Sequence, residues 1–436
     1  MERLNKPVDV INLVLFRILF GSIMLFEMIS YWNIPFIDEL IIKPKIHFTF
    51  DFASWVQPGP LPLMKALLVL NMVAAVFIII GRFFKPAILT FTLIYIYFFL
   101  LDKTYYNNHI YFIGNICMVF CLTHAHLNPF AKKDPKGKNL VQTVPYWQLF
   151  MFQFLFFIVY FYGGLAKLNV DWIAGKVTEK WFDAFPDVSL LQTKEAALFF
   201  ANAGLIFDLV IGFLLFYPKT RKIAFILCLI FNVNNAIMFK DISIFPYLMI
   251  GSLVLFIDPA WIRTKWGAVV NLATILSEKP MEIKTNPFPK WLLFFIIFHL
   301  LFPFRQVLFA GHTDWTGKAQ FFSWRMKSQH RKSNNITFYL THDNHPEKIR
   351  VPVEEYLVYE QFYAMAYHPE MLVQFAQFLK KDLSKKGVPN PVITAVTDVS
   401  LNGRPFQAMV DSTMDLTKIQ LGVFKQYDWV LPLKDR

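Results

Sequence analysis

The stretch FYGGLAKLNVDW, residues 161–172, decides the fold, because it ends an apolar run that begins near Tyr146 and starts a polar loop. It places Lys167 where a membrane helix is expected to end. An apolar setting disfavours the charged form of an amine, so this lysine can act as a base near neutral pH. The alternative, which position alone favours, is a lysine that snorkels to the membrane surface. Gly163 and Gly164 remove side-chain bulk, so a neighbouring helix or a flat ligand can approach.

The composition is that of a membrane protein. Of 436 residues, 56% are hydrophobic and 17% are charged, against about 25% charged in an average soluble domain. The net charge of +12 would suggest nucleic acid in a soluble chain, but here the basic residues lie mostly in short loops between apolar runs. We therefore expect no nucleic-acid partner. The three cysteines all lie in apolar runs, which favours packing roles over a disulfide framework or a metal site.

The apolar runs predict a mostly α, polytopic membrane bundle. A span needs about 20 residues, and fewer where helices are short or paired, so we expect about nine transmembrane helices. The runs are roughly 10–30, 63–81, 86–101, 109–126, 145–167, 196–217, 222–239, 242–257 and 290–309. Short basic loops such as those at 81–86 and 217–222 alternate with more acidic ones, which predicts a cytoplasmic N-terminus. An odd number of spans then places the C-terminal part in a periplasm or lumen.

The pattern changes after residue 309, so we predict two domains, a transmembrane domain over 1–309 and an extracytoplasmic β-rich domain over 310–436. Residues 336–341 alternate like a strand, and the apolar stripe over 369–386 is helical. Asn402-Gly403 is a strong two-residue hairpin signal, with flanking strands expected at 392–401 and 405–410.

Polar residues inside the spans each need a partner or a function, because a charge at mid-helix costs about 2.5–3.5 kcal/mol on insertion scales. Arg17, Glu27 and Asp208 are the clearest cases, and pairing with polar neighbours is their expected fate. Two further clusters stand out. The segment 102–109 ends in two asparagines and a histidine on the side where Lys167 emerges, and 231–235 carries three asparagines that either join helices or line a polar cavity.

Several motifs, in order along the chain, resemble the vitamin K-dependent γ-glutamyl carboxylase family and its bacterial relatives with an HTTM domain. They are LDKTYYNNH at 101–109, GLAKLNVDW at 164–172, GLIFDLVIGF at 204–213, FFSWRM at 321–326, VSLN at 399–402 and WVLPL at 429–433.

The resemblance implies a membrane lyase, a peptidyl-glutamate 4-carboxylase. Lys167 would deprotonate reduced vitamin K, O2 would then add, and a strongly basic oxygenated species would form and end as the epoxide. That base would remove a γ-proton from a glutamate of a peptide or protein substrate, and CO2 would trap the carbanion. Asn108 would hold a quinone oxygen with Asn107 and Asn235 nearby, and His109 would stabilise charge beside the reacting glutamate. No metal is implied.

Two other functions stay open at this point. Asn232 stands where the family often carries histidine, which gives mild support to a quinone-dependent membrane oxidoreductase or epoxidase without carboxylation. The third possibility is a non-catalytic membrane protein or a transporter, for which Lys167 would be dispensable.

Overall fold

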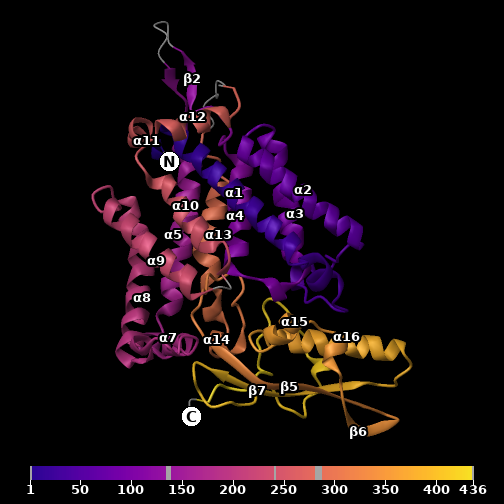
Figure 1. Ribbon diagram of the computed structural model, residues 1–436. Coiled ribbons are helices and arrows are strands. Elements are labelled where there is room, and N and C mark those ends of the chain that lie inside the picture. Colours follow the sequence, from indigo (N-terminus) through magenta and orange to yellow (C-terminus); the bar gives the residue numbers. More distant parts are fainter. Residues whose placement is uncertain (1, 134–138, 240–241, 280–286, 435–436) are drawn as a thin grey trace.

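The computed structural model describes residues 2–133, 139–239, 242–279 and 287–434. It is a helical bundle with a small sheet at one end (Figure 1). The N-terminus and the hairpin of β2 (Phe130–Lys133) and β3 (Asn139–Val141) lie at the opposite end. A second strand pair, β1 (Pro7–Asp9) with β4 (Thr143–Pro145), ties the start of the first helix to the start of α5.

Six helices of the described ranges are long and apolar enough to cross a membrane. They are α1 (Ile11–Asn33), α2 (Leu61–Ile80), α3 (Phe84–Leu101), α5 (Tyr146–Lys167), α8 (Lys194–Phe216) and α9 (Arg221–Met238). The protein is thus an integral membrane protein with a mostly helical fold, as the sequence predicted.

The other three expected spans fall on shorter or bent helices, so the count of nine is not confirmed. The first is α4 (Asn108–Leu122), and the last is α13 with its 3-10 continuation η8 (Leu292–Leu301 and Phe302–Leu308). Between them, α10 with η7 (Phe245–Gly251 and Ser252–Phe256) bends by 99° into α11 (Pro259–Lys265). If that bent pair counts as one span, the described helices give up to seven.

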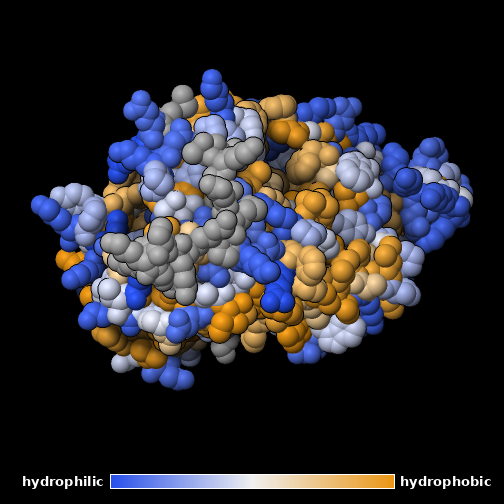
Figure 2. Space-filling model, turned by 90° about the horizontal axis from the view of Figure 1, so that it is seen from above, coloured by the Kyte–Doolittle hydropathy of each residue, from blue (hydrophilic) through white to orange (hydrophobic). Residues whose placement is uncertain are grey.

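The flanks of the bundle are apolar, as expected of surfaces that face lipid. Large hydrophobic side chains on α2, α3, α8 and α9 are exposed, among them Leu70, Leu93, Phe199 and Ile230. Seen from the end of the molecule at the top of Figure 1, hydrophobic residues occupy much of the lower right of the view, and hydrophilic residues lie mainly at the upper left and the right edge (Figure 2).

Two of the charged residues predicted to pair inside the bundle do so with polar neighbours. Arg17 is fully buried and donates to backbone oxygens at the ends of three segments, including Ile79 (2.7 Å) at the end of α2 and Ala125 (2.9 Å) after α4. It also donates to Leu276, just after α12 (Gly267–Ile275). Glu27 accepts from the hydroxyl of Ser243 at 3.1 Å. The carbonyl groups of Ile79 and Leu276 lie at helix ends and have no partner within their own helix, so Arg17 caps both α2 and α12.

Helices α5 and α8 approach each other closely at Gly164, next to the predicted site. A Cβ atom on this glycine would lie 2.9 Å from the backbone nitrogen of Leu209 and 2.8 Å from its side chain, nearer than real Cβ atoms come. Of the two uses suggested for this glycine, helix approach is the one that the structure shows.

Beyond the bundle, one helix packs on a three-stranded antiparallel sheet of order β6-β5-β7. The strands are β5 (Arg331–His342), β6 (His345–Arg350) and β7 (Val392–Leu401), and the helix is α16 (Glu370–Lys385). The ring of Phe375 on α16 meets that of Phe338 on β5 at 4.9 Å, and both residues are fully buried.

The smaller helices are α6 (Val170–Ile173), α7 (Lys176–Phe182), α14 (Thr313–Thr316) and α15 (Tyr359–Ala364).

The predicted turn at Asn402-Gly403 is present, but the strand expected after it is not. Both residues have positive φ, +52° and +79°, and the N–H of Arg404 donates to Leu401 across the turn at 3.1 Å. Residues 405–410 form only two isolated β-bridges. Gln407 pairs with Val399, and Val410 pairs with Val430. The region therefore contains some sheet rather than being β-rich.

We predict that Gly164→Ala lowers the thermal unfolding midpoint of the detergent-solubilised protein. The added methyl group would force α5 and α8 apart, and overpacking of this kind typically costs about 1–3 kcal/mol. Gly204→Ala on α8 is the matched control, because nothing lies within 4 Å of a Cβ there and alanine is the better helix former. Equal midpoints for the two variants would contradict the close packing at Gly164.

Candidate functional site

Lys167 is the last residue of α5, and its amine is buried rather than extended to the membrane surface. The residue is 7% exposed and forms an ion pair with Asp208 of α8. Its nitrogen also lies 5.0 Å from the centre of the Trp172 ring. The sequence predicted an amine in an apolar setting, and the structure adds to that setting a carboxylate and an aromatic face.

Asp208 reaches the lysine because the helices touch at Gly164. Leu209, the residue packed on that glycine, follows Asp208 directly, so the contact fixes the rotation of α8. Asp208 is only 4% exposed. Each buried charge thus has its partner, without which either would carry a large desolvation cost.

The segment 102–109 is held under the extramembrane region by buried polar contacts. Lys103 in the short helix η4 (Lys103–Tyr105) is 1% exposed and pairs with Glu370, the first residue of α16. The carboxylate of Asp102 accepts from Gln361 of α15 at 2.8 Å and caps η4 through the N–H of Thr104 at 2.9 Å. This loop is therefore rigidly placed at the junction of the two regions.

The amide of Asn108 is turned toward the extramembrane region. Its nitrogen donates to the backbone oxygen of Arg325 at 3.0 Å, and its oxygen accepts from the hydroxyl of Tyr106 at 3.2 Å. Asn107, just before α4, is half-buried. His109 is 6% exposed, and its ring lies 6.1 Å from that of Phe245 at the start of α10.

The third segment, residues 319–327, contains the FFSWRM motif and has a strained backbone. Four residues that are not glycine have positive φ, namely Ala319 (59°), Phe322 (59°), Trp324 (56°) and Lys327 (49°). Such conformations cost of order 1–3 kcal/mol each and persist where the surroundings fix them.

Two arginines hold this strained segment in place. Arg325 binds both oxygens of Asp314 at 2.7 Å and the side chain of Gln306 at 2.9 Å. Arg305, near the end of the last apolar run, donates to the hydroxyl of Ser323 at 2.9 Å and to the backbone oxygen of Phe321. Forked guanidinium contacts of this kind fix geometry as well as adding energy.

The three segments meet at residues 325 and 326. The backbone oxygen of Arg325 holds Asn108, and the methyl group of Met326 points at the lysine helix. A Cβ on Gly163 would lie 3.4 Å from that methyl carbon and 3.4 Å from a carboxylate oxygen of Asp208. Through the consecutive residues Arg325 and Met326, the structure brings the segment with Asn108 and the helix with Lys167 to one place.

Of the two roles left open for the asparagines of α9, the contacts of Asn232 show the first, the joining of helices. Asn232 is buried and joins helices, because its amide nitrogen donates to the hydroxyl of Tyr160 at 3.0 Å and to the backbone oxygen of Cys228 at 2.8 Å. Asn235 is half-buried, and its backbone oxygen accepts from Phe239 at 2.9 Å. Its contacts do not place it in the group formed by Asn108 and the ion pair.

The carboxylate of Asp171 joins the loop after Lys167 to the turn at Asn402-Gly403, and we call this set of contacts the latch. The carboxylate of Asp171 accepts from Asn402 at 2.9 Å, from Arg404 at 3.1 Å and from Lys176 at 3.1 Å. Burial alone would raise the pKa of this carboxyl group, but the hydrogen bonds from Arg404, Asn402 and Lys176 outweigh burial and lower the pKa of Asp171 to about 2.

Sequence reasoning did not find the supporting residues Arg305, Asp314 and Tyr106. Only Arg305 had a signal in the sequence, because a charged residue within an apolar run indicates a buried polar contact. Asp208 was recognised as a buried charge, but its partner was not. Among the residues that the structure describes, no group of three or more His, Cys, Asp or Glu side chains is arranged to hold a metal ion.

We predict a pH-dependent contribution of the latch to stability. Because the pKa of Asp171 is lower in the folded protein than its ordinary 3.8, the contribution is present above about pH 4 and is lost as the pH falls through 2. Asp171→Asn should therefore cost about 2 kcal/mol at pH 7, and its melting temperature should converge on that of the wild type between pH 4 and 2. The exposed Asp187→Asn is the control, with no gap at either pH. A constant gap for Asp171→Asn would refute the latch.

Comparison with protein families agrees with the motifs. Residues 5–261, more than half of the chain, match the model of the HTTM domain. Residues 285–436 match the model of the vitamin K-dependent gamma-carboxylase lumenal domain. No solved structure matches the chain. The chain belongs to the HTTM-domain family and, with its gamma-carboxylase lumenal domain, is a member of the vitamin K-dependent gamma-carboxylase family.

Proposed function

We propose that this protein is a peptidyl-glutamate 4-carboxylase, which uses reduced vitamin K, O2 and CO2 to convert glutamate side chains of a peptide or protein into γ-carboxyglutamate. The observation that carries the proposal is the buried Lys167–Asp208 ion pair at the end of α5, in a chain with both carboxylase-family domains. An amine with a proton-accepting partner, shielded from water, is what deprotonation of a quinol requires.

The residues present fit a reduced naphthoquinone. The ion pair offers an amine, Asn108 offers an amide, and Trp172 offers an aromatic face. An asparagine amide has two N–H donors, and Asn108 gives one to Arg325, which leaves a second for a quinone oxygen. When bound, the reduced quinone supplies with O2 the strong base that a γ-C–H bond demands.

The ion pair sets the order in which protons move. In the resting pair the amine of Lys167 donates a hydrogen bond to the carboxylate of Asp208. Before the lysine accepts a proton from a quinol hydroxyl, it must pass its own along this hydrogen bond to Asp208. Proton transfer therefore has two steps, first from Lys167 to Asp208 and then from the quinol to Lys167. Because both groups are buried, water does not compete for these protons.

The remaining roles rest on the family motifs. In this proposal His109 stabilises charge beside the reacting glutamate, and Asn107 and Asn235 belong to the wider quinone site. We also propose that residues 1–309 form the transmembrane domain with a cytoplasmic N-terminus, and that residues 310–436 lie in the periplasm or lumen. The description of the matched C-terminal domain as lumenal supports this orientation.

Oxidation of the quinol without carboxylation is the second candidate function. It is favoured by Asn232, which occupies a position where the family often carries histidine and whose amide nitrogen is engaged with Tyr160 and Cys228. A non-catalytic membrane protein or a transporter is the third. Purified protein given reduced vitamin K, labelled bicarbonate and a glutamate-containing peptide separates them: label in the peptide supports carboxylation, epoxide without label supports the second, and neither product supports the third.

We predict that Lys167→Ala abolishes epoxide formation, by at least about 100-fold, which is the lower end of what general acid–base groups contribute. The thermal midpoint should fall because Asp208 loses its partner, so turnover is compared at a temperature where both proteins are folded. Small amines added to the variant should restore part of the rate. Full activity in Lys167→Ala would show that the base is elsewhere.

Asp208→Asn tests the proton transfer to Asp208 separately, because asparagine keeps the shape of the side chain but accepts no proton. We expect a fall of about 10- to 100-fold in epoxide formation, which amines do not restore, since the lysine remains. Lys194→Ala, an exposed residue at the start of α8, is the control and should keep the wild-type rate. If Asp208→Asn kept the wild-type turnover, Asp208 would have a structural role only.

A further inference from the structure

The exposed side chains of the last apolar helix form one stripe along α13 and its 3-10 continuation η8. On the buried face of α13, the ring nitrogen Nε2 of His299 lies 2.9 Å from the side-chain oxygen of Asn115. The opposite face carries large apolar side chains at helical spacing, all of them exposed. They are Leu293, Phe294, Ile297, Leu300, Leu301, Phe304, Val307 and Leu308. A helix with this pattern packs on protein along one face and meets lipid along the other.

The length of this segment matches the thickness of a bilayer. Helix α13 has 10 residues and η8 has 7. Each residue advances about 1.5 Å in an α-helix and about 2.0 Å in a 3-10 helix, so the two measure about 15 Å and about 14 Å. Together they cover about 29 Å, close to the roughly 30 Å of the hydrocarbon core. Leu308, the last residue of η8, is therefore expected at one surface of the bilayer.

A loop of the C-terminal region is held against this end of η8. The side-chain nitrogen of Gln426 donates to the backbone oxygen of Leu308 at 3.2 Å, and its oxygen accepts from the backbone N–H two residues further on at 2.9 Å. At the other end of the loop, the buried amine of Lys318 donates to the backbone oxygen of Gly422 at 2.7 Å. Residues 423–425 thus lie between two fixed points.

The tip of this loop is apolar, which is unusual for an exposed turn. The N–H of Lys425 donates to the oxygen of Gly422 at 3.1 Å, which closes a β-turn with Val423 and Phe424 at its central positions. Turns usually carry Gly, Pro, Asn, Asp or Ser there. Val423 is 44% exposed and Phe424 is 86% exposed. Packing within the chain therefore does not explain why these two residues are apolar.

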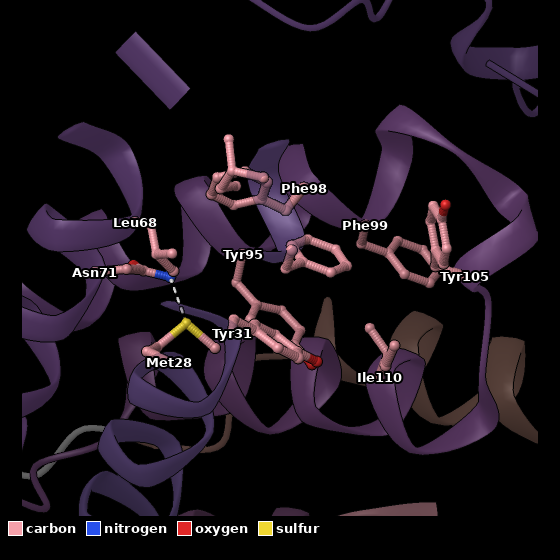
Figure 3. Close-up of a pocket in the computed structure, with 11 residues that line it drawn as sticks. Met28, Tyr31, Leu68, Asn71, Tyr95, Phe98, Phe99, Tyr105 and Ile110 are labelled. Carbon is pink, nitrogen blue, oxygen red and sulfur yellow. Dashed lines mark hydrogen bonds between the residues drawn. The ribbon is translucent and has the colours of Figure 1, made fainter. Parts of the chain in front are cut away.

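Aromatic residues inside the bundle have different surroundings. Tyr31, Tyr95 and Phe99 lie close to one another and to aliphatic side chains around a small pocket between α1, α2 and α3 (Figure 3). Phe424 has no such enclosure, and the surface next to it is the exposed end of η8.

We propose that the turn at residues 422–425 is a membrane anchor, in which Val423 and Phe424 insert into the surface of the lipid bilayer beside Leu308. The partner of this apolar tip is thus lipid rather than protein. The proposal concerns how the C-terminal region sits on the membrane, and it is independent of the carboxylase function.

Continuity of the surface selects lipid as the partner. The hydrogen bonds of Gln426 fix the turn at the point where the exposed stripe of η8 ends, so the tip continues a surface that already faces lipid. Apolar side chains at the boundary between headgroups and acyl chains are buried without any protein partner. The exposed Lys425 follows the tip directly, which places a positive charge where anionic headgroups attract it.

Fluorescence quenching tests where the tip lies. In a protein whose three cysteines are replaced by alanine, Val423→Cys carries the fluorophore NBD while Phe424 is kept. The protein is reconstituted into nanodiscs with one copy per disc, which excludes contact with a second copy. The same label on Glu347→Cys, an exposed residue of β6, serves as the reference for water. On Leu93→Cys, an exposed residue of α3, it serves as the reference for lipid.

We expect lipids with a doxyl group on the upper part of the acyl chain to quench the label at residue 423, as they quench the label at residue 93. Iodide in the water should quench it about tenfold less than the label at residue 347, because burial of a phenylalanine favours the inserted state by at least that factor. Iodide quenching equal to that at residue 347 would overturn the anchor. Protection from both quenchers would overturn it as well, because protein and not lipid would then cover the tip.

Phe424→Asp separates the tip from the rest of the C-terminal region, because a charge there opposes insertion. Iodide quenching of the label at residue 423 should then rise about tenfold, to the level seen at residue 347. The variant should remain folded by size-exclusion chromatography, since the side chain is exposed. Phe406→Asp, at another exposed phenylalanine of the same region, is the matched control and should leave the label protected. A label that stays protected in Phe424→Asp would refute the role of Phe424.

Discussion

The contact between α5 and α8 at Gly164 is the constraint on which the site depends. It brings a buried lysine and a buried aspartate, 41 residues apart in sequence, into one ion pair. Neither charge is tolerable alone at this depth, so the pair stabilises the helix packing that creates it. The catalytic chemistry proposed here uses the same property, because a proton can pass between Lys167 and Asp208 without leaving the protein.

The C-terminal region contacts both the segment of Asn108 and the helix of Lys167. Its strained segment 319–327 places the backbone oxygen of Arg325 against Asn108 and the methyl group of Met326 against the lysine helix. The buried pair of Lys103 and Glu370 attaches the same region to the loop before α4. The buried charges at this junction are paired, Lys103 with Glu370 and Arg325 with Asp314, which lets so much charge lie away from water.

Hydropathy alone predicted a helical membrane bundle, the end of α5 at Lys167 and the buried charges, because each leaves a local signal, but the predicted count of nine spans is not confirmed. Pairing is not local. Whether Asp208 meets Lys167 depends on the rotation of α8, which Gly164 sets. The left-handed Phe322 and Trp324 carry no glycine signal, since the arginines around them impose that conformation. The prediction of a strand over 405–410 was wrong. Turn residues indicate that the chain reverses its direction, but they do not indicate that the returning segment pairs along its whole length.

One carboxylate, that of Asp171, is shared between the loop that follows the lysine and the turn that carries Asn402 and Arg404. The outer region and the end of α5 consequently cannot move independently. The end of α5 and the C-terminal turn are thus tied together through a single carboxylate.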